Sequence, residues 1–149
     1  MINKFEGEFE FLSNFYESPI SDGKMEMPTV EHYFQAAKTA NKYDYIVIAT
    51  ARTPGEAKRK GRRTILRDDW EEVKIDVMRE ALRKKFAIPE LRQKLIATGP
   101  EYLEEGNWWH DNFWGVCHCV DCQDKRGQNN LGKLLMEIRA EIMEEKRNV

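Results

Sequence analysis

Helix start and stop signals recur along the chain and constrain its fold more than any other sequence feature. The clearest is Thr53-Pro54-Gly55-Glu56, in which a capping threonine precedes a glutamate by three residues and proline takes the first helical position. Thr29 is a second candidate cap, and Gly99 suits the left-handed position that follows a helix. These signals predict helices over about residues 30–40, 43–51, 54–61, 70–86 and 89–98, and a last helix that Asn130 caps.

Two of these segments carry apolar residues at helical spacing, which predicts that one face of each is buried. Their apolar positions are Trp70, Val73, Val77, Ala81 and Leu82 in one helix, and Leu131, Leu134, Leu135, Ile138 and Ile142 in the other. At 149 residues the chain is long enough to bury a core without disulfides. We therefore expect residues 1–149 to form one domain.

The N-terminal region differs from the rest. Aromatic residues recur at roughly every second position over residues 5–16, which predicts one or two short strands. Turn residues between 18 and 24 predict a hairpin that ends near Met27. The expected fold class is therefore mainly α with a small β element.

Charge and cysteine content exclude several functional classes. The formal net charge of −2 gives no strong field to recruit nucleic acid or an anionic membrane. No run approaches the roughly 20 apolar residues that cross a bilayer, and the first residues contain acids where a signal peptide needs an apolar stretch. Three cysteines close together make a poor disulfide framework. We expect a cytoplasmic protein with no membrane partner.

A polar stripe crosses the segment that Thr29 precedes. On a helix Glu31, Gln35 and Lys38 share one face, whereas the positions around them are apolar or small. Burying such a stripe is costly unless the groups pair or line a cavity. The stripe is therefore either a solvated face or the wall of a site that offers a carboxylate and a lysine for acid–base or nucleophilic chemistry.

Five cations occur within six residues in Lys58-Arg59-Lys60-Gly61-Arg62-Arg63. A run of this kind is commonly a solvated helix face. The alternative is a phosphate-binding surface, because arginine and lysine make charge-assisted bonds to phosphate oxygens. Nucleic acid is a weaker alternative, because no aromatic residues interleave the run.

A third candidate is the polar loop over residues 106–129, which contains three tryptophans within seven residues. Tryptophans are costly to leave in water, so they either plug a core or form a stacking wall for a flat ligand. We expect Trp108 and Trp109 to pack in the core. Trp114-Gly115 is the more site-like pair, because glycine allows close approach, and Asp111 lies three residues earlier.

The same loop contains Cys117, Cys119 and Cys122, which are metal-ligand candidates. Zinc requires four ligands, and His110 or His118 would have to supply the fourth. The alternative is that these are ordinary reduced thiols. Since three thiols in one cluster are only part of a zinc motif, the prediction is that no metal is required.

Taken together, these segments resemble the NADAR or YbiA-like family along nearly the whole chain. No single motif is diagnostic, but their order and spacing are specific. The matching residues are Phe11-Leu12-Ser13-Asn14-Phe15-Tyr16, Glu31-His32-Tyr33-Phe34-Gln35-Ala36-Ala37-Lys38, Lys58 with Gly61-Arg62, Trp70 with Lys74 and Met78, Lys85-Phe86, Thr98-Gly99, Asp111 with Trp114-Gly115, Gly127, Asn130-Leu131-Gly132, Leu135-Met136 and Arg139.

The resemblance implies a compact, mainly helical YbiA-like fold and an N-glycosidase that acts at the anomeric carbon of a ribose without a redox cofactor. One branch of the family cleaves phosphorylated riboflavin-pathway intermediates. The other removes ADP-ribose from guanine in nucleic acid and is paired with an ADP-ribosyltransferase toxin. Phosphorylated ribosyl or ADP-ribosyl compounds are therefore the expected substrates, and zinc binding is not inherited from the resemblance.

Carried onto this sequence, the resemblance suggests a site from two parts of the chain. Glu31 or Asp111 would activate the leaving base or a water, and Lys38 would stabilise charge or attack the ribose C1. The expected substrate-binding residues are Asn14, Phe15, Gln35, Lys58, Arg62, Trp114, Gly115 and Asn130. Among these, Lys58 and Arg62 would hold phosphate and Trp114 would stack on the base.

Two other functions remain open from the sequence. A non-catalytic module that binds NAD or ADP-ribose would use the same aromatic and cationic residues but would not need Glu31 and Asp111. A small zinc-stabilised nucleic-acid-binding protein would need stoichiometric zinc and would show steep salt dependence. The net charge argues against the second.

Overall fold

The structure is a computed structural model that describes residues 1–148. The chain forms two compact units. Unit 1 combines Met1–Ser13 with the chain from Pro89 onward, and unit 2 is Asn14–Ile88. No helix among the described residues is both long enough and apolar enough to cross a membrane.

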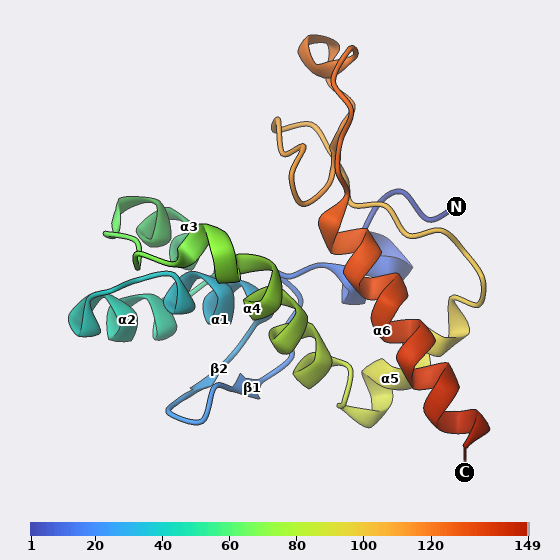
Figure 1. The fold of residues 1–149 in the computed structure, drawn as a ribbon, viewed down its shortest axis with the longest axis horizontal. Coiled ribbons are helices and arrows are strands. Elements are labelled where there is room, and N and C mark those ends of the chain that lie inside the picture. The colour runs from blue at the N-terminus through green and yellow to red at the C-terminus, as the bar shows by residue number, and fades with distance from the viewer. Residues whose placement is uncertain (149) are drawn as a thin grey trace. The chain divides into compact units, whose positions relative to one another are not determined.

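Unit 2 contains four helices and a short hairpin among the described residues. Their bounds are β1 (Ile20–Ser21), β2 (Glu26–Met27), α1 (Val30–Ala37), α2 (Lys42–Ala49), α3 (Pro54–Arg63) and α4 (Trp70–Lys85). Helix α1 packs against the other three, and α2 and α3 also contact each other (Figure 1). Because it lies among these partners, α1 is buried from Val30 through Ala36.

Two helix starts in unit 2 follow the predicted capping chemistry. The Thr29 side chain accepts a hydrogen bond from the backbone N–H of His32, and Thr53 accepts one from Glu56. Pro54 takes the first helical position of α3, as predicted. Beyond α3, residues 65–67 pair with residues 38–40, so that Lys38 accepts a bond from the backbone N–H of Arg67 at 2.9 Å. This pairing fixes the backbone of Lys38.

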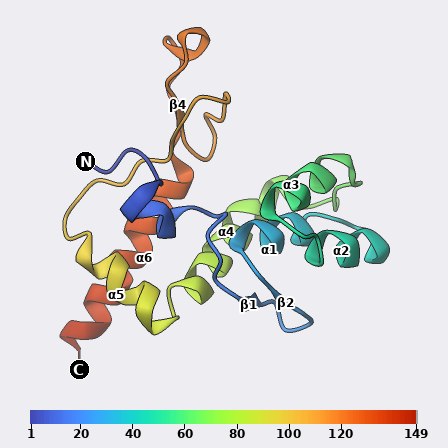
Figure 2. The same cartoon turned by 180° about the vertical axis from the view of Figure 1, so that it is seen from behind.

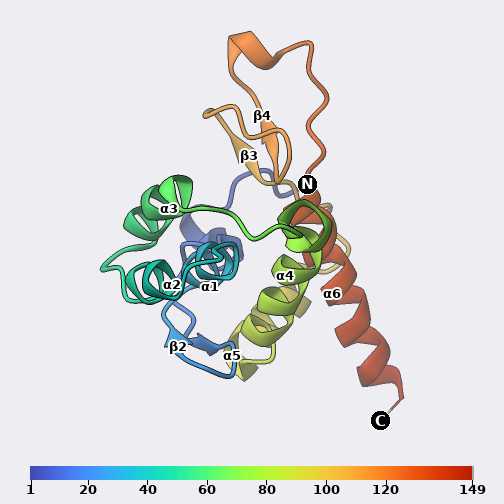
Figure 3. The ribbon, with the colours of Figure 1, turned by 60° about the vertical axis from the view of Figure 1, so that its left-hand side comes forward.

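Among the described residues, unit 1 contains two helices, short 3₁₀ segments and a two-stranded parallel pair (Figures 2 and 3). The bounds are η1 (Gly7–Leu12), α5 (Pro89–Ala97), β3 (Gly106–Asn107), β4 (Val116–Cys117), η2 (Val120–Cys122) and α6 (Asn130–Arg147). Helices α5 and α6 pack together, and the five predicted apolar positions of α6 are all buried. Gly99 ends α5 with φ of +61°, as expected.

The mainly helical prediction is confirmed, with two corrections. The strands predicted over residues 5–16 are wrong, because residues 7–12 form the 3₁₀ helix η1, which buries Phe11 and Leu12. The cap predicted at Asn130 is also displaced: Asn129 is the N-cap of α6, in the left-handed conformation with φ of +51°. That conformation aims the Asn129 side chain at the loop, where its Nδ2 donates to the Leu103 carbonyl at 2.9 Å. One domain over residues 1–149 stays a prediction.

Candidate functional site

The polar stripe of α1 is buried over its first two residues. Glu31 is 7% exposed and Gln35 is 5% exposed, so the alternative of a solvated face is wrong for both. Gln35 Nε2 donates a hydrogen bond to Glu31 Oε1 at 2.9 Å, one helical turn away. A carboxylate buried beside an amide donor is an arrangement that binds or transfers protons rather than one that solvates a surface.

Lys38 continues the stripe and is half-buried. Burial lowers the pKa of its ammonium group, and the nearby charges of Arg62, Lys58 and Lys74 lower it further, against the opposing effect of Glu31. A lysine with a lowered pKa has a larger fraction of neutral, nucleophilic amine near neutral pH. The structure thus brings the predicted residues Glu31 and Lys38 close enough for their charges to interact, with two predicted phosphate ligands beside them.

Lys58 and Arg62 stand one turn apart on α3, which explains why both affect Lys38. The close packing of α3 against α1 depends on Gly61. A Cβ at Gly61 would lie 1.9 Å from Gln35 Oε1 and 3.2 Å from Gln35 Cβ. Only glycine therefore lets the cationic turn of α3 pack onto the polar stripe of α1.

Lys74 on α4 was not among the predicted site residues, although its charge also lowers the pKa of Lys38. The spacing of residues along α4 indicates that Lys74 faces the site. Trp70 lies one turn earlier on α4 and packs on Phe34 of α1, with ring centroids 5.0 Å apart. Residues four apart share a helix face, so Trp70 indicates that Lys74 also faces α1.

Two buried acceptors in this region have no hydrogen-bond partner among the described residues: Asn14 Oδ1 and Gln35 Oε1. The Gln35 nitrogen faces the Glu31 carboxylate, so the amide oxygen is the atom left without a partner. Asn14 is also held at the start of α1, because its backbone carbonyl accepts a hydrogen bond from the Glu31 backbone N–H at 3.1 Å. Unsatisfied buried acceptors are rare in folded proteins and mark places where a ligand donor can bind.

The remaining predicted residue of unit 2, Phe15, is 45% exposed and follows Asn14 directly. His32, which lies within the same motif, has a structural role instead. Its Nε2 bonds to the Ala51 carbonyl at 2.8 Å and its Nδ1 bonds to the Thr29 hydroxyl at 2.8 Å. Because a carbonyl only accepts, Nε2 is the donor to Ala51. This fully buried imidazole therefore ties the start of α1 to the chain just after α2.

Lys85 is a second buried or half-buried lysine of unit 2 that was not among the predicted site residues. It is fully buried, and that burial lowers its pKa to about 7. Its ammonium lies 5.7 Å from the Tyr16 ring centroid and 5.2 Å from that of Phe86. The signal was again the period of the helix, because Lys85 continues the stripe formed by the buried residues Met78 and Leu82.

The other four predicted residues lie in unit 1. Asp111 Oδ1 accepts hydrogen bonds from the backbone N–H groups of Phe113 and Trp114, at 3.1 and 2.9 Å. Trp114 packs edge-on against Phe113, with centroids 4.8 Å apart. Asn130 Nδ2 donates to the Phe113 carbonyl at 2.9 Å. Asp111 and Asn130 therefore hold the turn that presents Trp114.

Gly115 and Asn107 organise the same loop. A Cβ at Gly115 would lie 2.0 Å from the Glu105 carbonyl oxygen, so glycine is required there. Asn107, which is fully buried, donates to the Asp111 carbonyl at 2.8 Å and accepts from the N–H of Asp111 at 3.2 Å. Its role was not predicted, because a lone asparagine in a polar loop has no distinguishing pattern.

The core positions predicted for Trp108 and Trp109 are wrong. They are 51% and 58% exposed. Trp108 lies beside His118, with centroids 5.5 Å apart, and the Lys4 ammonium lies 5.4 Å from its ring. These contacts give Trp108 partners at the surface. The core prediction considered only the free-energy cost of exposing a tryptophan to water and so did not include such partners.

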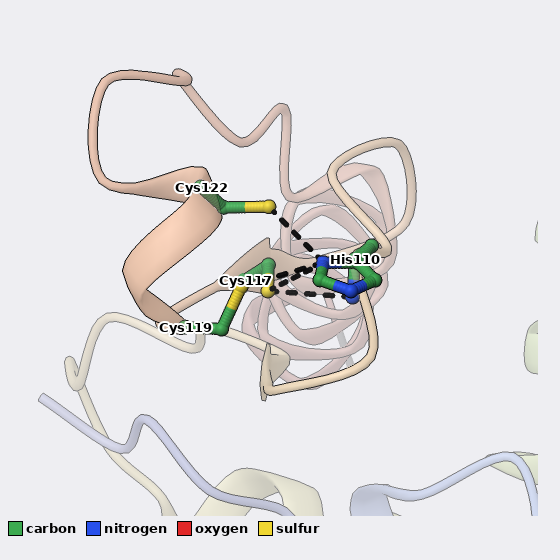
Figure 4. A group of neighbouring side chains, drawn as sticks. All are labelled: His110, Cys117, Cys119 and Cys122. Carbon is green, nitrogen blue, oxygen red and sulfur yellow. Dashed lines mark hydrogen bonds between the residues drawn. The ribbon is translucent and has the colours of Figure 1, made fainter.

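The three cysteines meet a histidine in this loop (Figure 4). One ligand atom from each of His110, Cys117, Cys119 and Cys122 lies within 4.8 Å of every other. His118 lies apart from them and pairs with Glu104, Nε2 to Oε2 at 3.1 Å. Of the two histidines considered as a fourth ligand, the structure therefore places His110 with the thiols.

Comparisons with known proteins cover most of the chain. The NADAR domain family model matches residues 2–143. The N-glycosidase YbiA of Escherichia coli is 44% identical over 139 residues, which cover 91% of this chain and 82% of YbiA. A riboflavin biosynthesis protein of Vibrio vulnificus is 35% identical over 137 residues, covering 90% of this chain and 36% of that protein.

The fold agrees with a solved structure. The NMR structure of E. coli YbiA matches with a TM-score of 0.85 and 38% identity, covering 100% of this chain and 89% of that chain. The YbiA-like fold and the N-glycosidase class inferred from the sequence motifs are thereby confirmed. The chain belongs to the NADAR domain family and is an enzyme of the N-glycosidase class.

Proposed function

We propose that this N-glycosidase hydrolyses the bond between ribose C1 and a base nitrogen in phosphorylated intermediates of riboflavin biosynthesis. The observation that carries the proposal is the environment of Lys38, a half-buried lysine whose pKa is lowered and which has a buried carboxylate and three cations beside it. The names of two relatives, the riboflavin biosynthesis proteins of Vibrio vulnificus and Zea mays, favour this substrate class.

The chemistry follows from the lowered pKa of Lys38. In its neutral form the Lys38 amine attacks C1, the C1–N bond breaks, and the base leaves with the bonding electrons and gains a proton. Opening of the ribose ring gives a Schiff base between Lys38 and C1. Water then adds to C1, the lysine leaves, and the products are the free base and ribose phosphate.

Glu31 is placed to handle protons in both steps, because it is buried and its charge reaches Lys38. Its bond from Gln35 Nε2 holds the carboxylate in one orientation. The unsatisfied oxygens of Gln35 and Asn14 are acceptors for hydroxyl groups of the ribose or N–H groups of the base.

Phosphate binding is assigned to Lys58 and Arg62, with Lys74 as a third cation. All three affect the pKa of Lys38, so their charges converge on the place where the ribosyl group would react. Lys74 also pairs with Glu71 at 3.0 Å. Positive charges that converge in this way are suited to a phosphate, and a bound phosphate would in turn offset their effect on Lys38. The assignment of Asp111, Trp114, Gly115 and Asn130 to substrate binding stays a prediction from the sequence.

The test is a paired assay that offers a phosphoribosylated riboflavin intermediate and DNA carrying ADP-ribosylated guanine. The wild type should release the base from the first substrate, and Lys38→Ala should lower turnover by roughly 10³-fold or more. Lys42→Ala is the matched control, because Lys42 is an exposed lysine at the start of α2 and should retain full turnover.

Borohydride added during turnover should trap the substrate on Lys38, and peptide mass spectrometry would locate the adduct. An adduct at another lysine, or none in an active enzyme, would remove the nucleophilic role. Turnover of only the ADP-ribosylated DNA would replace the riboflavin substrate with the other branch and would support pairing with a modifying toxin. Binding of ADP-ribose without turnover of either substrate would contradict the proposal.

A further inference from the structure

The loop between β3 and α6 gathers four metal-binding side chains from three short segments. His110 follows β3, Cys117 ends β4, and Cys119 and Cys122 lie at the two ends of η2. The sulfur atoms of Cys119, Cys122 and Cys117 lie 3.3, 3.4 and 3.9 Å from His110 Nδ1 (Figure 4). All three thiols therefore converge on one nitrogen of one imidazole.

These spacings match a metal tetrahedron. Zinc binds thiolate at about 2.3 Å and imidazole nitrogen at about 2.0 Å, and tetrahedral angles then separate each sulfur from the nitrogen by about 3.5 Å. The observed separations of 3.3 to 3.9 Å bracket that value. We propose that His110 Nδ1 and the sulfurs of Cys117, Cys119 and Cys122 form a zinc-binding site.

Backbone N–H groups point at two of the sulfurs. Those of Asp121 and Cys122 donate to Cys119 Sγ, and that of His110 donates to Cys117 Sγ at 3.3 Å. Hydrogen bonds of this kind stabilise the negative charge that a ligating sulfur carries. His110 itself adopts the left-handed conformation with φ of +70°, which is unfavourable for a histidine unless other contacts hold it.

Four protein ligands complete a tetrahedron, so no position is left for water or substrate. The site is therefore structural rather than catalytic. His118 is not part of the cluster, and its Nε2 pairs with Glu104 instead. A soft donor set of three sulfurs and one nitrogen selects zinc over magnesium or calcium, which prefer oxygen.

The surrounding loop needs such a constraint, because it buries little apolar surface of its own. Val120 in η2 is 79% exposed, and Trp108 and Trp109 are more than half exposed. Segments without a sufficient apolar core are commonly held by metal or disulfide. The zinc would fix both ends of residues 110–117, which include Asp111 and Trp114.

The experiment measures metal directly and does not depend on turnover. Protein expressed with zinc in the medium should contain about one zinc per chain by mass spectrometry of the elements. His110→Ala and the double variant Cys119→Ser/Cys122→Ser should lose at least nine-tenths of it. His118→Ala is the matched control and should retain it, because His118 lies outside the cluster.

A second measurement uses the wild type alone, in case the variants fail to fold. The reduced, metal-free chain titrated with Co²⁺ should show the intense visible bands of tetrahedral thiolate coordination, which one equivalent of Zn²⁺ then removes. Wild type that contains less than a tenth of an equivalent of zinc and gives no such bands would overturn the site. So would stoichiometric iron, or zinc loss in His118→Ala equal to that in His110→Ala. An active but zinc-free enzyme would contradict this site and leave the glycosidase proposal standing.

Discussion

The two regions that carry the candidate residues are held in place by different means. In unit 2, Glu31 and Gln35 lie on α1 and Lys38 is its C-cap, and three other helices pack against α1. In unit 1, the loop over residues 106–128 has two-residue strands and a 3₁₀ turn, and its shape depends on side chains that bond to backbone groups. Helix packing positions the first set, and polar anchors position the second.

This difference predicts how each region tolerates change. In a packed helix, the loss of one contact is small beside the many apolar contacts that remain. The loop depends instead on a few buried groups, such as Asn107, and on the Cys and His cluster. Charges can be retuned in unit 2 without loss of fold. In the loop, loss of one anchor should release several backbone groups at once.

The largest effect is expected from Glu31→Gln. This variant tests whether a residue of unit 2 can be changed so that activity falls while the stability of the fold is kept. Glutamine can still accept the bond from Gln35, so the free energy of unfolding should change little. Activity should fall by roughly 10²–10⁴-fold in kcat/KM, as for loss of an acid–base group. The measurement is steady-state kinetics beside thermal denaturation.

A role for Glu31 that is only electrostatic predicts the opposite change in activity. The Glu31 charge raises the pKa of Lys38, so its removal lowers that pKa further and increases the neutral amine. If Glu31 only tuned this pKa, Glu31→Gln would be as active as the wild type or more active near pH 7. That outcome would remove the acid–base role.

The next effect is expected in the loop. Asn107→Ala removes the donor to the Asp111 carbonyl and the acceptor for the Asp111 N–H, and the region is buried. Unfolding free energy should fall by about 1–3 kcal/mol, measured by urea denaturation. Trp108→Ala, at an exposed side chain of the same loop, should change it by less than about 0.5 kcal/mol. Equal effects would contradict the anchored-loop description.

Gly61→Ala tests the helix contact in unit 2. The new Cβ would overlap Gln35 Oε1, so Gln35 must turn away from Glu31, and we expect a loss of roughly 1–3 kcal/mol. Adding Gln35→Ala provides space and should restore part of that stability, while activity stays low. A fully additive double variant would show that the two residues are not coupled.

A separate effect, spread over several pH units, is a pH dependence that Lys85 adds to unit 2. Its pKa is about 7 in the folded chain and 10.5 in the unfolded chain, so between these values the unfolded state binds more protons. Stability should therefore rise with pH from about 7 to about 10, by up to about 1.4 kcal/mol per pH unit, and Lys85 should add no pH dependence below that range. Lys85→Met should flatten the slope in urea denaturation at pH 7.5, 8.5 and 9.5. An unchanged slope would contradict the assigned pKa.

Local sequence determined the parts of this protein that depend on neighbours within one helical turn. The caps at Thr29 and Thr53, the buried stripe of α6 and the shared face of Glu31 and Gln35 were all predictable, because these contacts join residues three or four apart. The family motifs added the N-glycosidase class. The cysteine cluster was visible in the sequence, but its fourth ligand was not.

Tertiary structure decided what depends on distant partners. It turned residues 7–12 into a 3₁₀ helix, placed Lys74 near Lys38, and put His110 rather than His118 beside the thiols. It also buried Lys85 and exposed Trp108. Such outcomes follow from which surfaces meet once helices and loops pack, and burial then sets the pKa values on which the chemistry of a lysine or a thiol depends.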